Sequence, residues 1–138
     1  MDFKIRINKI FKAFDRPLPG KVAHKELAPY RNEIELDFKN KNPKVASTLL
    51  LIYPKDGETF FCLIERQEYE GTHSNQISFP GGKNESGESM KETALRETKE
   101  EIGVDPISIN IIGELTQVYV PPSNFLIHPF VGYCDFKP

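Results

Sequence analysis

The chain has 138 residues, 38% hydrophobic and 28% charged, and its 18 basic and 20 acidic residues leave a net charge of −2. This length suits one domain with a buried core, and the balanced charge argues against binding nucleic acid or a membrane surface through bulk electrostatics. No apolar run is as long as a membrane span, and the first residues lack a signal-peptide core. We therefore expect one cytoplasmic domain, residues 1–138, with no nucleic-acid or membrane partner.

The amino-terminal part is predicted to be a helix followed by an arm. Residues 3–14 read as an amphipathic helix because Phe3, Ile7, Ile10, Phe11 and Phe14 recur at helical spacing. The stretch PLPGKVAHKELAPYRN, residues 17–32, is marked by prolines and is too polar for a core strand. We expect an irregular arm there, so that residues 1–43 precede a core formed by residues 44–138.

The core begins with a predicted β-hairpin. Residues 44–54 and 59–66 are apolar and rich in strand formers, and the turn sequence KDGE lies between them. Two more strand candidates are residues 108–120 and 125–136. Cys62 and Cys134 both lie in these apolar runs, which favours buried thiols over a disulfide or a metal role.

A charged helix is predicted between these strand pairs. Ser89 followed by Glu92 forms a capping box, and Gly103 is a left-handed stop, so the helix runs from about residue 90 to residue 102. Ala94, Leu95, Thr98 and Ile102 share the flank that would face the core.

Three glutamates, Glu97, Glu100 and Glu101, gather near the end of this helix. Like charges at this spacing cost about 0.2–0.5 kcal/mol per pair and oppose the helix dipole. One interpretation is a solvated charged face, with Arg96 and Lys99 as partial compensation. The interpretation we favour is a site for a hard divalent cation such as Mg²⁺, which prefers oxygen ligands.

The residues around this helix resemble the Nudix box, G-x5-E-x7-R-E-U-x-E-E-x-G-U, where U is apolar. Only Thr98, where an aliphatic residue is usual, departs from the pattern. The matching positions are Gly82, Glu88, Arg96, Glu97, Glu100, Glu101, Gly103 and Val104. The resemblance implies an α/β fold, an α/β/α sandwich with a mixed β-sheet.

The resemblance also implies a metal-dependent hydrolase and assigns roles to the box residues. Glu97 and Glu101 would be the principal ligands of Mg²⁺ or Mn²⁺, Glu100 would join for further ions, and the Gly81 carbonyl would complete the site. Arg96 would orient the glutamates and Glu88 would tie the loop to the helix. The general base stays open between Glu97, Glu100 and a residue outside the box, so Glu97, Glu100 and Arg96 are the candidate catalytic residues.

The run before the box resembles the signature of coenzyme A (CoA) pyrophosphatases, L-L-x-x-R-x4-R-x3-G-x3-F-P-G-G. Gly71 and Asn75 depart from it. The matching residues are Leu63, Arg66, Phe79, Pro80, Gly81 and Gly82. The resemblance implies a substrate site formed by Arg66, Phe79, Pro80, Gly82 and Lys83, with a nucleotide-type small molecule as its partner.

Simpler interpretations of these loops stay open. FPGGK can be only a turn into the helix, Arg66 a plain surface residue and His73 a loop histidine. The segment PPSN, residues 121–124, is first of all a turn, and its alternative role is to line the substrate site.

The leading function is therefore hydrolysis of the pyrophosphate bond of CoA or acyl-CoA to 3′,5′-ADP and (acyl-)phosphopantetheine. Within the same chemistry, the alternative is another nucleoside-diphosphate-linked substrate, such as ADP-ribose, a dinucleotide or a damaged nucleotide. A regulator that binds nucleotides without turnover is a further alternative. It predicts losses among the box glutamates, and none is lost here.

The given sequence ends soon after the last strand candidate, which raises the question of what covers both faces of the predicted sheet. The run STLLLIY is apolar on both alternations, so its sheet needs cover on both faces, and no helix follows residue 136. The amino-terminal helix can supply some of that cover. We expect the chain to be a fragment that lacks C-terminal elements of the sandwich, or a partner subunit, as in a homodimer, to supply the missing layer.

Overall fold

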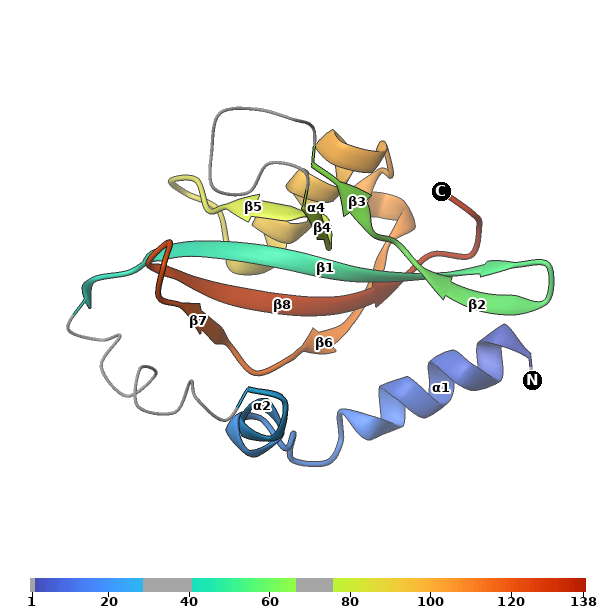
Figure 1. The fold of residues 1–138 in the computed structure, drawn as a ribbon. Coiled ribbons are helices and arrows are strands. Elements are labelled where there is room, and N and C mark those ends of the chain that lie inside the picture. Colours follow the sequence, from blue (N-terminus) through green and yellow to red (C-terminus); the bar gives the residue numbers. More distant parts are fainter. Residues whose placement is uncertain (1, 29–40, 67–75) are drawn as a thin grey trace.

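The computed structural model describes residues 2–28, 41–66 and 76–138, and shows two longer helices on either side of a β-sheet (Figure 1). The helices are α1 (Phe3–Ala13), α2 (Lys21–Leu27), α4 (Met90–Ile102) and the short 3₁₀ turn η3 (Pro106–Ser108). The strands are β1 (Lys44–Lys55), β2 (Glu58–Phe61), β3 (Ile64–Glu65), β4 (Ile77–Ser78), β5 (Gly81–Lys83), β6 (Asn110–Glu114), β7 (Val118–Val120) and β8 (Phe125–Tyr133).

The two long strands β1 and β8 form the centre of the sheet. They run parallel, with register from Lys44 opposite Phe125 to Ile52 opposite Tyr133. Strands β2 and β5 pair antiparallel with the other edge of β1, and β6 and β7 pair antiparallel with the other edge of β8. The predicted mixed sheet is therefore confirmed.

The predicted hairpin is also confirmed, although its second strand is shorter than expected. Asp56 and Gly57 both have positive φ, 50° and 77°, as a two-residue turn between β1 and β2 requires. The strand predicted over residues 59–66 breaks after Phe61. Its remainder, β3, leaves the main sheet and pairs with β4 in a separate two-stranded ribbon.

Alternate residues of β1 pack against different helices. Leu49 and Leu51 are fully buried in a cluster with Ala94 of α4 and Phe130. On the opposite face, Ile52 and Val131 pack with Ile7 of α1. The amino-terminal helix therefore covers part of the second face, as predicted.

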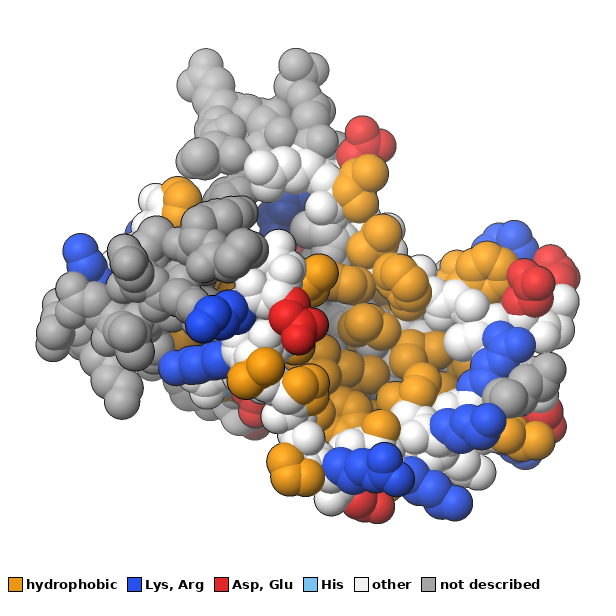
Figure 2. Space-filling model, turned by 60° about the horizontal axis from the view of Figure 1, so that its bottom comes forward, with side chains coloured by type: hydrophobic (Ala, Val, Ile, Leu, Met, Phe, Trp, Pro, Cys, Tyr) orange, Lys and Arg blue, Asp and Glu red, His pale blue; other side chains and the backbone are white. Residues whose placement is uncertain are grey.

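Cover on that second face is incomplete among the residues that the structure describes. Seen from the side of α1 and α2, hydrophobic side chains gather over a continuous area in the middle of the molecule (Figure 2). The prediction that a further segment or a partner subunit completes this layer stays a prediction.

The arm after α1 differs from its prediction, because residues 21–27 form the helix α2. Gly20 precedes it with φ 53° and lies so close to Thr116 that an added Cβ would be 2.9 Å from Thr116 Oγ1. This helix has no buried residue and therefore no hydrophobic periodicity for sequence analysis to detect. The rest of the predicted arm, residues 29–32, lies outside the described residues.

The predicted boundaries of the charged helix are confirmed. The Ser89 hydroxyl accepts a hydrogen bond from the Glu92 backbone N–H at 3.1 Å, and Gly103 ends the helix at φ 74°. Thr98, the one departure from the box pattern, is fully buried, and its hydroxyl donates to the Ala94 carbonyl at 2.7 Å. The helix thus tolerates this threonine without an unpaired buried hydroxyl.

Both cysteines are free thiols, and the predicted burial is complete for Cys134 but only partial for Cys62. Cys134 is fully buried in the α4-side cluster, and the half-buried Cys62 packs against that cluster. Burial, with a smaller contribution from Cys134, raises the pKa of Cys62 to about 11. No helix in the described part of the chain has the length and apolar character that crossing a bilayer requires.

The docking of α1 can be tested with two isoleucines of the same helix. Ile7 is 5% exposed and Ile5 is 49% exposed. We expect Ile7→Ala to lower the free energy of unfolding by about 2–4 kcal/mol, because it leaves a cavity against the sheet. Ile5→Ala, the matched control, should change it by less than about 0.5 kcal/mol. Urea denaturation measures both, and equal effects would show that α1 does not pack as described.

Candidate active site

Arg96 lies at the centre of the ion-pair network on α4. Its Nε donates to Glu88 Oε2 at 2.6 Å and its Nη2 donates to Glu88 Oε1 at 3.0 Å, a two-pronged contact. Nη2 also donates to the Lys83 carbonyl at 3.1 Å. Because Glu88 precedes the helix and Lys83 ends β5, this one side chain fastens the helix to both the loop and the sheet.

Glu88 is held by more than Arg96. Its Oε1 accepts from the Glu85 backbone N–H at 2.9 Å and from the Thr93 hydroxyl at 3.0 Å. The Asn84 amide closes the loop by donating to the Glu88 carbonyl at 3.1 Å and to Thr93 Oγ1 at 2.8 Å. Hydrogen bonds from Arg96, and then from Glu85, lower the pKa of Glu88 to about 2. This geometry agrees with the loop-fastening role that the box assigns to Glu88.

The remaining nitrogen of Arg96 faces two of the box glutamates. Nη1 donates to Glu97 Oε1 at 2.9 Å and lies 3.3 Å from both carboxylate oxygens of Glu100. The Glu97 side chain is 18% exposed, whereas that of Glu100 is 58% exposed. Arg96 therefore offsets the repulsion between these charges and fixes the inner one, Glu97.

Two glycines of β5 bring the sheet against these carboxylates. A Cβ on Gly82 would overlap the Glu97 carboxylate, and a Cβ on Gly81 would overlap the Ser47 carbonyl and the Thr48 backbone. β5 itself was not predicted, because glycines have low strand propensity and only the pairing with β1 makes them a strand. Glycine is needed at both positions because the β5 backbone lies close to β1 and to the Glu97 carboxylate, and not because of a positive φ.

The pKa of Glu101 is perturbed in the opposite direction to that of Glu88. Burial, together with neighbouring Glu97, raises the Glu101 pKa to about 7 against the opposing effects of the Gly81 backbone N–H and the charge of Arg66. Its Oε2 is buried and has no hydrogen-bond partner. An unpaired carboxylate oxygen beside a second carboxylate is the arrangement that a bound cation would satisfy.

The residues present thus fit a divalent cation through two carboxylates. Glu97 and Glu101 lie together, but Glu100 turns toward Arg96. Within the described ranges no three acidic, histidine or cysteine side chains converge on one metal position. A two-carboxylate site that leaves other positions to water and phosphate is typical of Mg²⁺. The ligand roles of Glu97, Glu101, Glu100 and Gly81 stay predictions.

A cavity of about 360 Å³ is lined in part by Gly82, the glycine that lies against the Glu97 carboxylate. Four of the predicted substrate residues, Arg66, Phe79, Gly82 and Lys83, line it. The fifth, Pro80, is fully buried and does not. The predicted turn after β7 also contributes, through Ser123.

The inner wall of this cavity was not predicted. It comes from side chains of the central strands, Ala46, Thr48, Phe125 and Ile127. These are ordinary strand residues, and only the parallel register of β1 and β8 brings them together. His73, Gly71 and Asn75, considered above, lie outside the described residues.

A family model for the NUDIX domain matches residues 43–135. The chain belongs to the Nudix family. It is 40% identical over 87 residues to Nudix hydrolase 3 of Caenorhabditis elegans, an alignment that covers 63% of this chain and 36% of that protein. It is 24% identical over 106 residues to the peroxisomal coenzyme A diphosphatase NUDT7 of Mus musculus, covering 76% of this chain and 44% of that one.

Solved structures agree with this Nudix fold. The crystal structure of an Ap4A hydrolase from C. elegans superposes with a TM-score of 0.57 at 19% identity, covering 70% of each chain. At this identity the likeness shows the fold alone. The chain spans less than half the length of the two curated relatives named above.

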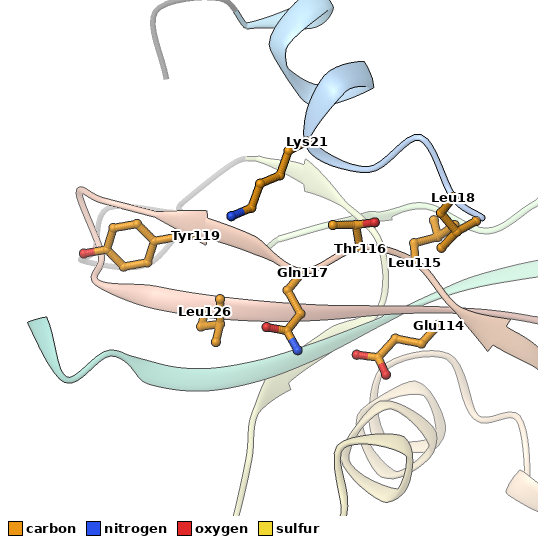
Figure 3. A pocket seen from close by; sticks show the side chains of 8 residues that line it. All are labelled: Leu18, Lys21, Glu114, Leu115, Thr116, Gln117, Tyr119 and Leu126. Atoms are coloured by element: carbon orange, nitrogen blue, oxygen red, sulfur yellow. The ribbon is translucent and has the colours of Figure 1, made fainter. Parts of the chain in front are cut away.

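A second cavity, of about 440 Å³, lies between α2 and the segment that joins β6 to β7 (Figure 3). Lys21 extends toward it from α2, and Gln117 and Glu114 extend from the sheet side. None of the box residues lines this cavity, whereas Gly82 of the box lines the cavity of about 360 Å³.

The two β5 glycines predict different defects. Gly81→Ala should lower the free energy of unfolding by about 3 kcal/mol or more, because backbone atoms of β1 cannot move aside. Gly82→Ala should fold within about 1 kcal/mol of wild type, because only the end of the flexible Glu97 side chain must shift. It should nevertheless weaken Mn²⁺ binding measured by titration calorimetry. A Gly82→Ala protein that unfolds as readily as Gly81→Ala would contradict this placement of Glu97.

Proposed function

We propose that this Nudix domain is a Mg²⁺- or Mn²⁺-dependent hydrolase that cleaves the phosphoanhydride bond of CoA or acyl-CoA. The products would be 3′,5′-ADP and (acyl-)phosphopantetheine. The observation that carries the proposal is the Glu97–Glu101 pair, with its unpaired buried oxygen, beside a cavity that Arg66 and Lys83 line. We further propose that residues 44–138 form the hydrolase core and residues 1–43 a helix and arm that accompany it.

The roles of the residues follow from their positions. Glu97 and Glu101 would hold the cation, and Arg96 would keep Glu97 in place. A bound divalent cation would polarise a phosphoryl oxygen and lower the pKa of a bound water. Arg66 and Lys83 would bind substrate phosphates in the cavity, since cationic side chains pair strongly with phosphate oxygens. Glu97 and Glu100 are the candidate bases of the box.

The substrate class rests on three observations. The run before the box resembles the CoA pyrophosphatase pattern, a mouse CoA diphosphatase is among the relatives, and two cationic side chains, Arg66 and Lys83, line the cavity. The 3′-phosphate of CoA is a dianion that ADP-ribose lacks, and it gives such cations an additional partner. The presence of all the box glutamates disfavours a regulator without turnover.

A substrate panel tests this proposal. Purified protein would be incubated with CoA, dephospho-CoA and ADP-ribose, with Mg²⁺, with Mn²⁺ and with a chelator, and the products identified by mass. We expect metal-dependent release of 3′,5′-ADP from CoA. If ADP-ribose and dephospho-CoA are cleaved as fast as CoA, the substrate is a broader nucleoside-diphosphate class and only the hydrolase proposal survives.

Glu101→Gln tests the metal pair. It keeps the size of the side chain but removes the charge, so we expect kcat to fall at least about a hundredfold. Stability in the absence of metal should be unchanged or higher, because repulsion from Glu97 is relieved. The metal-induced rise in Tm that we expect for wild type should disappear in this variant.

Glu92→Gln is the matched control for that variant. It removes the same charge from the exposed first turn of α4, away from the site. It should keep both the activity and the metal-induced rise in Tm. Wild-type turnover by Glu101→Gln in Mg²⁺ would reject the assignment of Glu101.

A further inference from the structure

An exposed phenylalanine, Phe61, lies next to Phe79 in the wall of the cavity of about 360 Å³ and extends the apolar surface of that wall. Phe61 ends β2, opposite Ile52, and is 52% exposed. Its ring centroid lies 6.0 Å from that of Phe79, with the planes tilted by 41°. Because Phe79 lines the cavity, the two rings form a surface that begins inside the cavity and ends at Phe61. We call these two rings the aromatic shelf.

The register of the strands places the shelf on the same side of the sheet as the cavity wall. Phe61 pairs with Ile52, whose side chain packs on the α1 side. Ala46 and Thr48, which line the cavity, lie an even number of positions before Ile52 on β1, so their side chains point to that side too. The α1 side is the one on which hydrophobic side chains gather in Figure 2. The cavity and the shelf therefore belong to one continuous face.

The neighbouring Phe60 is less exposed than Phe61, 37% against 52%, and has partners on its own side of β2. Phe60 points to the opposite side and is stacked on Tyr53, with centroids 5.9 Å apart and planes 23° apart. The Lys55 ammonium also lies 5.7 Å from the centre of the Phe60 ring. Phe60 thus has local cover, whereas half of Phe61 is left to contact water or a ligand.

The cavity and the shelf together suit a ligand with two unlike ends. Arg66 and Lys83 line the cavity and favour anionic phosphates. The shelf has no charge and offers apolar surface, which favours contact with uncharged, apolar groups. A matching ligand carries phosphates at one end and an uncharged, largely aliphatic arm at the other.

We propose that Phe61 and Phe79 bind the arm attached to the second phosphate of the substrate, and that Phe61 thereby selects substrates with an aliphatic arm. In a CoA-type substrate this is the pantetheine arm, whose dimethyl group follows directly after the phosphate. ADP-ribose has a polar sugar at that position and gains little from the rings. The inference rests on the proposed function, and it makes Phe61 a specificity residue that takes no part in the chemistry.

The test compares three variants on two substrates. Wild type, Phe61→Ala, Phe61→Leu and the control Phe60→Ala would be assayed with CoA and with ADP-ribose in Mg²⁺, and KM and kcat determined separately. Each methylene group buried against the rings is worth about fourfold in affinity. We therefore expect Phe61→Ala to raise the KM for CoA about tenfold, with kcat nearly unchanged and ADP-ribose kinetics unaltered.

The other variants separate specificity from folding. Phe61→Leu keeps an apolar side chain and should restore most of the affinity for CoA, and Phe60→Ala should match wild type on both substrates. Equal losses on CoA and ADP-ribose, or no loss on CoA, would overturn the role of Phe61 while leaving CoA hydrolysis in place. If wild type cleaves ADP-ribose but not CoA, the proposed substrate is wrong and the shelf proposal is rejected with it.

Discussion

The site depends on the two-pronged contact between Arg96 and Glu88. A helix that carries three glutamates in its last two turns is unfavourable alone, because the charges repel each other and oppose the helix dipole. Arg96 places one guanidinium among Glu88, Glu97 and Glu100, so each carboxylate faces a cation. The planar fork of arginine can make these contacts at once, which a lysine ammonium cannot do with the same geometry. The acidic surface beside the cavity is stable because of this one residue.

Close packing is the second constraint on the site. β5 pairs with β1 and also touches α4, and there is no room for a side chain at Gly81 against β1 or at Gly82 against Glu97. The glycines let the sheet backbone touch the Glu97 carboxylate from one side while Arg96 holds it from the other. A larger residue at Gly81 would push β5 away from the backbone of β1, whereas one at Gly82 would displace the Glu97 carboxylate.

Local signals predicted the parts of the fold whose causes are local. The caps at Ser89 and Gly103 fixed the limits of α4, and the Asp56–Gly57 turn fixed the first hairpin. The elements that were not predicted depend on pairing with residues distant in sequence or have no hydrophobic periodicity. Helix α2 buries no residue, β5 consists mainly of glycine, and the break after Phe61 reflects the pairing of β3 with β4.

The same distinction holds for the site. The box pattern identified the residues around Arg96, because their spacing is a property of one loop and one helix. The cavity wall from Ala46, Thr48, Phe125 and Ile127 is a property of sheet register, which sequence spacing does not contain. Pro80 was expected at the cavity with its neighbours, but in the bend between β4 and β5 its side chain is fully buried and does not line the cavity.

The parallel pairing of β1 with β8 has a consequence for how the protein acquires its activity. The first strand of the core can pair with β8 only after the last strand has been made. The paired residues, from Lys44 with Phe125 to Ile52 with Tyr133, are separated by almost the whole core in sequence. Such distant contacts form late and slowly, because the conformational entropy of the long intervening segment is lost before the contacts can compensate for it. During synthesis, α4 and its ion pairs can form early, whereas the cavity wall has to wait until β8 has left the ribosome. The acidic helix α4 would therefore be present in the nascent chain before the substrate cavity exists.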